Sequence, residues 1–99
     1  DEAVGVASFS PTTSDGVYKL HKLYVNATLQ GHGIGKKLVH YIVMEIQRNG
    51  GGALHLNVNR DNKAKGFYEK LGFEVIREED INIGNGYWMN DYVMRKELR

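Results

Sequence analysis

The sequence predicts an α/β domain of the α+β type, in which a mixed β-sheet holds one strand–helix–strand crossover between two antiparallel hairpins. An amphipathic helical pattern lies between two strand-like runs, so those strands are expected to pair in parallel through a right-handed crossover. Turn residues at 11–16 and at 84–86 each join two further strand-like runs, as antiparallel hairpins do. The expected order is strand, strand, helix, strand, helix, strand, strand.

The first hairpin is expected over residues 3–25. Residues 3–9 are small and apolar, residues 11–16 are turn formers ending in Asp15-Gly16, and residues 17–25 are strand-like. An uncovered sheet edge at residues 3–9 would let a second copy of the chain pair there, so a homodimer through this edge is a prediction.

The first helix is expected to begin at Ile34, because apolar residues recur from there at the three- and four-residue spacing of an amphipathic helix. These residues are Ile34, Leu38, Val39, Ile42, Val43 and Ile46. Asn49 and the three glycines after it end the helix. The triple glycine follows a helix instead of opening one, so it is interpreted as a stop and linker.

A third strand is expected over residues 53–58, where apolar side chains alternate with His55 and Asn57. A short helix follows, with Asp61 or Asn62 as its N-cap and Gly72 as its stop. Its apolar face comprises Ala64, Phe67, Tyr68 and Leu71. The runs 73–83 and 87–98 then flank Gly84-Asn85-Gly86 as the last hairpin.

Composition limits the possible functions. The 99 residues suit one small domain over residues 1–99, and the net charge of +1 arises from intermixed charges, which disfavours a nucleic-acid partner. The lack of cysteine excludes disulfides, thiolate metal sites and cysteine nucleophiles, and fits a reducing, cytoplasmic compartment. No apolar run approaches ~18 residues, so no membrane association is expected.

The run Gln30-Gly31-His32-Gly33-Ile34-Gly35 precedes the first helix and is a candidate phosphate-binding loop. Glycines let the main chain approach an anion closely, and the helix N-terminus offers unpaired N–H groups and a favourable dipole. The same glycines could form only a tight turn, and both interpretations stay open on these residues alone.

Two familiar nucleotide motifs do not match this loop. The Walker pattern fails because Gly35-Lys36 is followed by Lys37 and because Gln30 stands where the first glycine would fall. The dinucleotide fingerprint fails because Lys36 or Leu38 stands at its last glycine, depending on the register.

What does match is Gln30-x-x-Gly33-x-Gly35 after a strand that ends in Leu23-Tyr24-Val25. Residues 62–73, NKAKGFYEKLGF, supply a second motif at the expected distance, beyond one helix and one strand. In these two motifs the chain resembles the GNAT superfamily of N-acetyltransferases, and the resemblance covers residues 3–98.

The resemblance implies how acetyl-CoA would bind. Main-chain N–H groups of residues 30–36 would hold its pyrophosphate: Gln30, Gly31, His32, Gly33, Ile34, Gly35 and Lys36. The backbone of Leu23, Tyr24 and Val25 would pair with the pantetheine arm as an added strand, and an N–H near Val25 would polarise the thioester carbonyl. Asn62, or Asp61 in its place, would lie near the pantetheine. Lys36 and Lys37 either add charge there or are solvated.

The resemblance also implies that Tyr68 is the catalytic acid. An amine that attacks the thioester directly expels a CoA thiolate, and a phenol with a pKa of about 10 can protonate it. The alternative is that Tyr68 is one more aromatic residue on the buried face of a short helix.

A general base is not evident, because Asn57 stands where some relatives carry a glutamate on the third strand. His21 is a possible substitute, Glu2, Glu78, Glu79 and Asp80 are further candidates, and deprotonation through water is an equal alternative. The four histidines, at 21, 32, 40 and 55, lack metal-ligand spacing, so no metal is assigned. Tyr87, Trp88 and Tyr92 either line an acceptor pocket or stabilise cross-strand packing.

The leading hypothesis is an acyltransferase that moves acetyl from acetyl-CoA to a primary amine of an unidentified acceptor. The alternative is a CoA-binding module with little or no catalysis. A complete GNAT domain carries a further strand and helices before the first strand, and this chain begins at Asp1 without methionine. We therefore expect a truncated start, an absent or removed segment, or a minimal form completed by a second chain.

Overall fold

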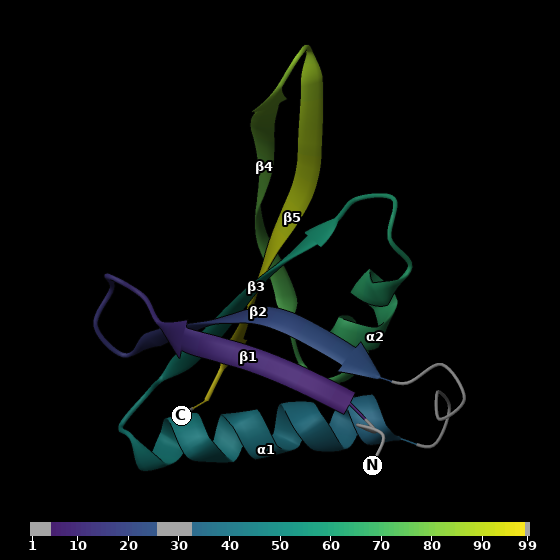
Figure 1. Ribbon diagram of the computed structural model, residues 1–99. Coiled ribbons are helices and arrows are strands. Elements are labelled where there is room, and N and C mark those ends of the chain that lie inside the picture. Colours follow the sequence, from purple (N-terminus) through teal and green to yellow (C-terminus); the bar gives the residue numbers. More distant parts are fainter. Residues whose placement is uncertain (1–4, 26–32, 99) are drawn as a thin grey trace.

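The computed structural model describes residues 5–25 and 33–98 of the 99-residue chain. Within these residues, five strands form one sheet in the order β1-β2-β3-β5-β4, accompanied by two helices (Figure 1). The elements are β1 (Gly5–Pro11), β2 (Val17–Val25), α1 (Ile34–Arg48), β3 (Ala53–Asn59), α2 (Ala64–Lys70), β4 (Glu74–Gly84) and β5 (Tyr87–Glu97). β2 and β3 pair in parallel and all other neighbours are antiparallel. The predicted mixed sheet and element order are confirmed.

Several predicted boundaries are wrong by one or two residues. β1 runs to Pro11, which pairs with Tyr18, because an edge strand tolerates a proline without an N–H on its outer side. The short helix takes Lys63 as its N-cap, whereas Asp61 or Asn62 was expected. The Asn62 side chain instead accepts the backbone N–H of Ala64 at 2.8 Å, so it still supports the start of α2.

Both helices pack on one face of the sheet. Alternate residues of β3 are buried there, and they contact the inner side of α1 and part of α2. The buried cluster comprises Leu20, Val39, Ile42, Ile46, Leu54, Leu56, Val58, Phe73, Met94 and Leu98. The opposite face, which we call the open face, carries His55 and Asn57 of β3, and none of the described helices covers it.

β2 and β3 are paired only over their first residues. The register runs from Val17 opposite Ala53 to Leu20 opposite Leu56 and then stops, although both strands continue. His21 is the extra residue of a bulge, because Ser8 and Phe9 of β1 pair with Lys22 and Leu20. A bulge bends its strand and increases its twist, so β2 separates from β3 where the pairing ends.

The hairpin of β4 and β5 rises well beyond the other strands (Figure 1). Asn85 and Gly86 turn its tip with positive φ angles of 53° and 77°, as a two-residue type I′ turn requires. Arg60, in the loop after β3, forms ion pairs with Glu78 and Asp80 of β4. These contacts tie the projecting hairpin to the loop that leads into α2.

The two sheet edges are β1 and β4. The edge predicted near residues 3–9 is therefore an edge of the sheet, although residues 3 and 4 lie outside the described residues. Pairing of a second copy along it stays a prediction. Neither described helix has the length and apolar character needed to span a membrane.

Candidate active site

The separation of β2 and β3 exposes backbone between two strands of one sheet. Beyond Leu20, the residues Leu23, Tyr24 and Val25 pair with β1 on one side and with no described strand on the other. An extended ligand can add to such a free strand side through main-chain hydrogen bonds. The strand predicted to hold a pantetheine arm thus has an unpaired side.

The N-terminus of α1 lies just after this strand in the chain. Gly33 is its N-cap, with φ 74° and ψ 12°, a left-handed conformation that glycine adopts without strain. The first intrahelical bond runs from the Lys37 N–H to the Gly33 carbonyl at 3.0 Å. The N–H groups of Ile34, Gly35 and Lys36 precede it, and the first turn has no acidic residue. This end of α1 suits an anion.

Only part of the predicted loop can be located. Gln30, Gly31 and His32 lie outside the described residues, so the structure does not test their predicted contacts. Gly33 caps the helix, whereas Gly35 already belongs to its first turn. The described half of the loop therefore offers helix N–H groups.

A cavity of about 670 Å³ adjoins the start of α1, and we call it the α1–α2 cavity. Five of its lining side chains are basic groups from three elements: Lys36, Lys37, His40, Lys70 and Lys96. Sequence reasoning missed His40, Lys70 and Lys96 as site residues. His40 stands one turn after Lys36, a spacing that could have indicated it, whereas Lys70 and Lys96 join the group only through the fold.

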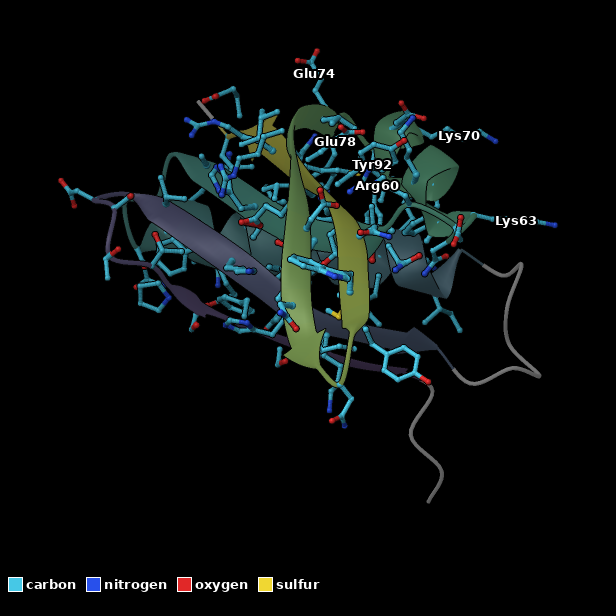
Figure 2. The ribbon with its side chains drawn as sticks, turned by 90° about the horizontal axis from the view of Figure 1, so that it is seen from above. Arg60, Lys63, Lys70, Glu74, Glu78 and Tyr92 are labelled. Atoms are coloured by element: carbon cyan, nitrogen blue, oxygen red, sulfur yellow. The ribbon has the colours of Figure 1, made fainter. Side chains whose placement is uncertain are left out.

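Two lysines of this cavity differ in how they are held. Lys96 donates to the Leu71 carbonyl at 2.6 Å, which binds the end of α2 to β5. Lys70, the last residue of α2, extends outward, as does Lys63, which precedes the helix (Figure 2). The cavity thus combines one anchored ammonium group with a freely extended one, and both favour a phosphate-rich ligand.

Tyr68 is half-buried on the inner face of α2. Its ring packs edge to face between Phe67, at 5.2 Å between centroids, and Phe73, at 5.6 Å. Burial raises the pKa of the Tyr68 phenol above 10.0. The side chain is therefore protonated throughout the neutral pH range, as a proton donor must be. Tyr68 packs against the core, and its phenol is in the protonated form that the predicted role requires.

Asn57 lies on the open face, one residue beyond the last β2–β3 pair. Its Nδ2 donates to Glu79 Oε1 and to Asp91 Oδ2, each at 3.2 Å. Both partners are carboxylates, so the amide nitrogen must face them and Oδ1 must face away. Asp91, 3% exposed, was not recognised from sequence because nothing local indicates that it reaches Asn57.

The other candidate bases occupy different surroundings. His21 is the bulged residue of β2, and its Nε2 lies 2.5 Å from Oγ of Ser10 in β1. Glu78 and Asp80 face Arg60, away from Asn57, and Figure 2 shows Glu78 beside Arg60. Glu2 lies outside the described residues.

The hairpin aromatics divide into two groups. Tyr92 packs against the buried cluster, with Lys65 Nζ 5.5 Å from its ring centroid. Tyr87 and Trp88 are 69% and 56% exposed near the tip. Packing therefore accounts for Tyr92 and not for the other two. Within residues 5–25 and 33–98, no group of three His, Cys, Asp or Glu side chains is arranged to hold a metal ion.

Known proteins share this architecture. Residues 1–97 match the family described as the acetyltransferase (GNAT) domain. The 5-NmdU N-acetyltransferase of Pseudomonas phage PaMx11 is 38% identical over 60 residues, which are 60% of this chain and 41% of that protein. The peptidyl-lysine N-acetyltransferase YjaB of Salmonella typhimurium is 37% identical over 67 residues, 66% of this chain and 43% of that protein.

A solved structure extends the comparison. It is yncA of Salmonella typhimurium, determined with its cofactor acetyl-CoA. It is 26% identical, with a TM-score of 0.79 over 97% of this chain and 58% of that chain. The chain spans less than half the length of the curated relatives that it matches. The match of residues 1–97 to the family, together with the shared fold, establishes that this chain belongs to the GNAT acetyltransferase domain family.

Proposed function

We propose that this chain binds acetyl-CoA and transfers its acetyl group to a primary amine. The observation that carries the proposal is the separation of β2 from β3 beside the α1 N-terminus and the basic α1–α2 cavity. An extended arm needs an unpaired strand, and a polyphosphate needs N–H groups and cations. The two requirements meet at one place in the fold.

In this proposal the pyrophosphate accepts hydrogen bonds from Gly33, Ile34, Gly35 and Lys36, together with Gln30, Gly31 and His32. The remaining phosphate-bearing end of acetyl-CoA occupies the α1–α2 cavity near Lys70. The cavity volume of about 670 Å³ lies within the usual range for small-molecule sites. The proposed contacts thus account for both the helix end and the lysines.

The pantetheine arm is proposed to run along Leu23, Tyr24 and Val25, with Asn62 or Asp61 near it. An N–H near Val25 polarises the thioester carbonyl and stabilises the oxyanion of the tetrahedral intermediate. The acceptor approaches from the open face, where Asn57 borders the separation of the strands. This geometry brings nucleophile and thioester together from opposite sides of the sheet.

The chemistry is direct acyl transfer. The neutral amine nitrogen attacks the thioester carbon, a C–N bond forms, the C–S bond breaks, and the Tyr68 hydroxyl donates its proton to the departing sulfur. The nitrogen loses a proton as the amide forms, and this proton balances the one that returns the Tyr68 phenolate to its acid form through water. The ammonium proton of the acceptor must leave before attack. Glu79, held against Asn57 at the open face, is the candidate base that the geometry favours. Proton loss through water to Glu79 fits this arrangement.

Two measurements test the proposal in sequence. Calorimetric titration with acetyl-CoA should give saturable binding at submillimolar concentration, and an absence of binding at millimolar concentration would contradict it. Thiol release should then be followed with a panel of primary amines. Release that depends on both amine and acetyl-CoA is the expected result.

A CoA-binding module with little catalysis is the second candidate. In this alternative the given residues hold the cofactor and do not by themselves complete an acceptor site. Binding of acetyl-CoA without thiol release for any amine would select this alternative. Three predictions apply to both candidates and stay predictions: a single domain truncated at its start, a cytoplasmic location, and a homodimer through the β1 edge.

A further inference from the structure

A second cavity lies on the open face, on the opposite side of the sheet from the helices. Its volume is about 290 Å³, and it extends from the turn between β1 and β2 across β2, β3, β5 and β4. Lys19, His55, Asn57 and Arg77 contribute polar side chains to its lining. We call it the open-face cavity. None of the contacts proposed above for acetyl-CoA uses it.

Positive charge dominates this cavity. Lys19 forms no ion pair within the described residues, and Arg77 forms a long one, with its Nε 3.9 Å from Glu79 Oε2. The pKa of His55 is lowered, first by burial and then by the positive charges of Arg95, Arg77 and Lys19. Only the negative charge of Glu97 acts to raise it. The lining contains Lys19, His55 and Arg77 and no carboxylate side chain, a combination that favours an anionic ligand.

The register explains why these groups meet. Lys19 of β2 lies opposite His55 of β3, and Arg77 of β4 lies opposite Val93, which in turn lies opposite Asn57. The cationic side chains thus share one face with Asn57, next to the point where β2 and β3 separate. Asn57 links the cavity to the proposed site of acetyl transfer.

We infer that the open-face cavity is an oxyanion site for the acceptor, in which Lys19 and Arg77 bind a carboxylate or phosphate group carried by the same molecule as the reacting amine. The inference rests on the proposed acetyl transfer for the identity of the occupant. A cavity of about 290 Å³ suits a molecule of amino-acid size. Amines without an anionic group would leave Lys19 without an ion-pair partner and bind more weakly.

The first test measures anion binding without acetyl transfer. Inorganic phosphate and propionate are titrated separately at constant ionic strength, and the ring resonances of His55 are followed by NMR, with His55→Gln to assign them. At least one anion should give a saturable shift and raise the pKa of His55. Lys19→Gln and Arg77→Gln should each weaken binding roughly tenfold.

Arg48→Gln is the matched control, because it removes one cation from the exposed end of α1, where Arg48 pairs with Glu45. It should leave anion binding unchanged. Equal weakening in the control, or no saturable shift with either anion, would overturn the oxyanion site. A response to propionate alone selects a carboxylate, and a response to phosphate alone selects a phosphate.

The second test compares matched acceptors. With acetyl-CoA present, β-alanine is compared with propylamine, and phosphoethanolamine with ethanolamine. The anionic member of at least one pair should show a kcat/KM at least about tenfold higher, and Lys19→Gln should abolish the difference. Equal values in both pairs would overturn the assignment of the acceptor. If anions bind but no amine releases CoA, acetyl transfer is contradicted and the oxyanion site stands.

Discussion

Leu20 of β2 and Leu56 of β3 form the last register pair between these parallel strands. Both side chains are buried, at 5% and 2% exposure, so the end of the pairing is anchored in the core. The next residue of β2, His21, is the bulged one, and the next residue of β3 is Asn57. The separation of β2 from β3 is therefore set by the packing of these two leucines and by the bulge that follows them.

Tyr68→Phe should lower turnover about 100-fold while leaving affinity for acetyl-CoA nearly unchanged. The substitution removes only the hydroxyl and retains the ring contacts with Phe67 and Phe73. Since burial raises the pKa of Tyr68 above 10.0, its acid form is lost only as pH rises beyond that value. Rates from pH 6 to 9 with saturating acetyl-CoA check this, and an unchanged rate would remove Tyr68 from the acid role.

Gly33→Asn should weaken acetyl-CoA binding without loss of stability. Asparagine tolerates the left-handed conformation at φ 74°, and a Cβ built at Gly33 meets no described atom within 4 Å. An added side chain at this position would therefore clash with a bound ligand and not with the protein itself. Gly33→Val adds backbone strain and should also lower the free energy of unfolding by about 1–2 kcal/mol. Normal affinity of Gly33→Asn would contradict the phosphate-binding assignment.

Lys70→Gln should weaken acetyl-CoA binding roughly fivefold at low salt and less at high salt, because its exposed charge is screened. Binding of acetyl-pantetheine, which lacks the phosphates, should not change. Lys65→Gln is a matched control on the same helix, where Lys65 pairs with Glu69. Similar losses for both variants, or for both ligands, would argue against Lys70 as a phosphate contact.

Gly51→Ala should destabilise the protein by about 1–3 kcal/mol through overpacking. A Cβ at Gly51 would overlap Ile46 Cγ2 and lie 2.9 Å from Tyr18 Cε1. Gly66→Ala is the comparison: its Cβ meets nothing within 4 Å inside α2, so about 0.8–1 kcal/mol of stability should be gained. Urea unfolding of both variants measures the contrast, and a stable Gly51→Ala would show that the α1–β3 connection can shift.

Acid should destabilise the wild-type protein more than a His55→Gln variant. The pKa of His55 is lowered from 6.5 in the folded state, so the unfolded chain binds its proton first as pH falls. Stability then decreases below about pH 6.5 until the folded-state pKa is passed. The charged groups involved are Arg95, Arg77, Lys19 and Glu97. Parallel pH profiles of unfolding free energy for the two proteins would contradict this account.

Local periodicity and turn chemistry accounted for most of the fold. The helical spacing from Ile34 predicted α1, and alternation across Leu54, Leu56 and Val58 predicted the buried face of β3, because each depends only on neighbouring residues. The Asn85-Gly86 tip followed from the need for positive φ angles. Errors were confined to element ends, where pairing partners decide how far a strand extends.

The candidate site was predicted in part. The glycine motif and Tyr68 could be named because they lie in contiguous, recognisable segments. The grouping of Lys70 and Lys96 with the start of α1 could not, nor could the contacts of Asn57 with Glu79 and Asp91, which are 22 and 34 residues away. Such groups converge only through register and helix packing.

The sequence by itself determined the element order, the buried faces and the family, since these depend on local patterns along the chain. The tertiary structure alone decided where β2 leaves β3, which lysines surround the helix end, and which charges share the open face with Asn57. Strand register and the bulge at His21 arise from pairing between distant residues, and no local pattern encodes them.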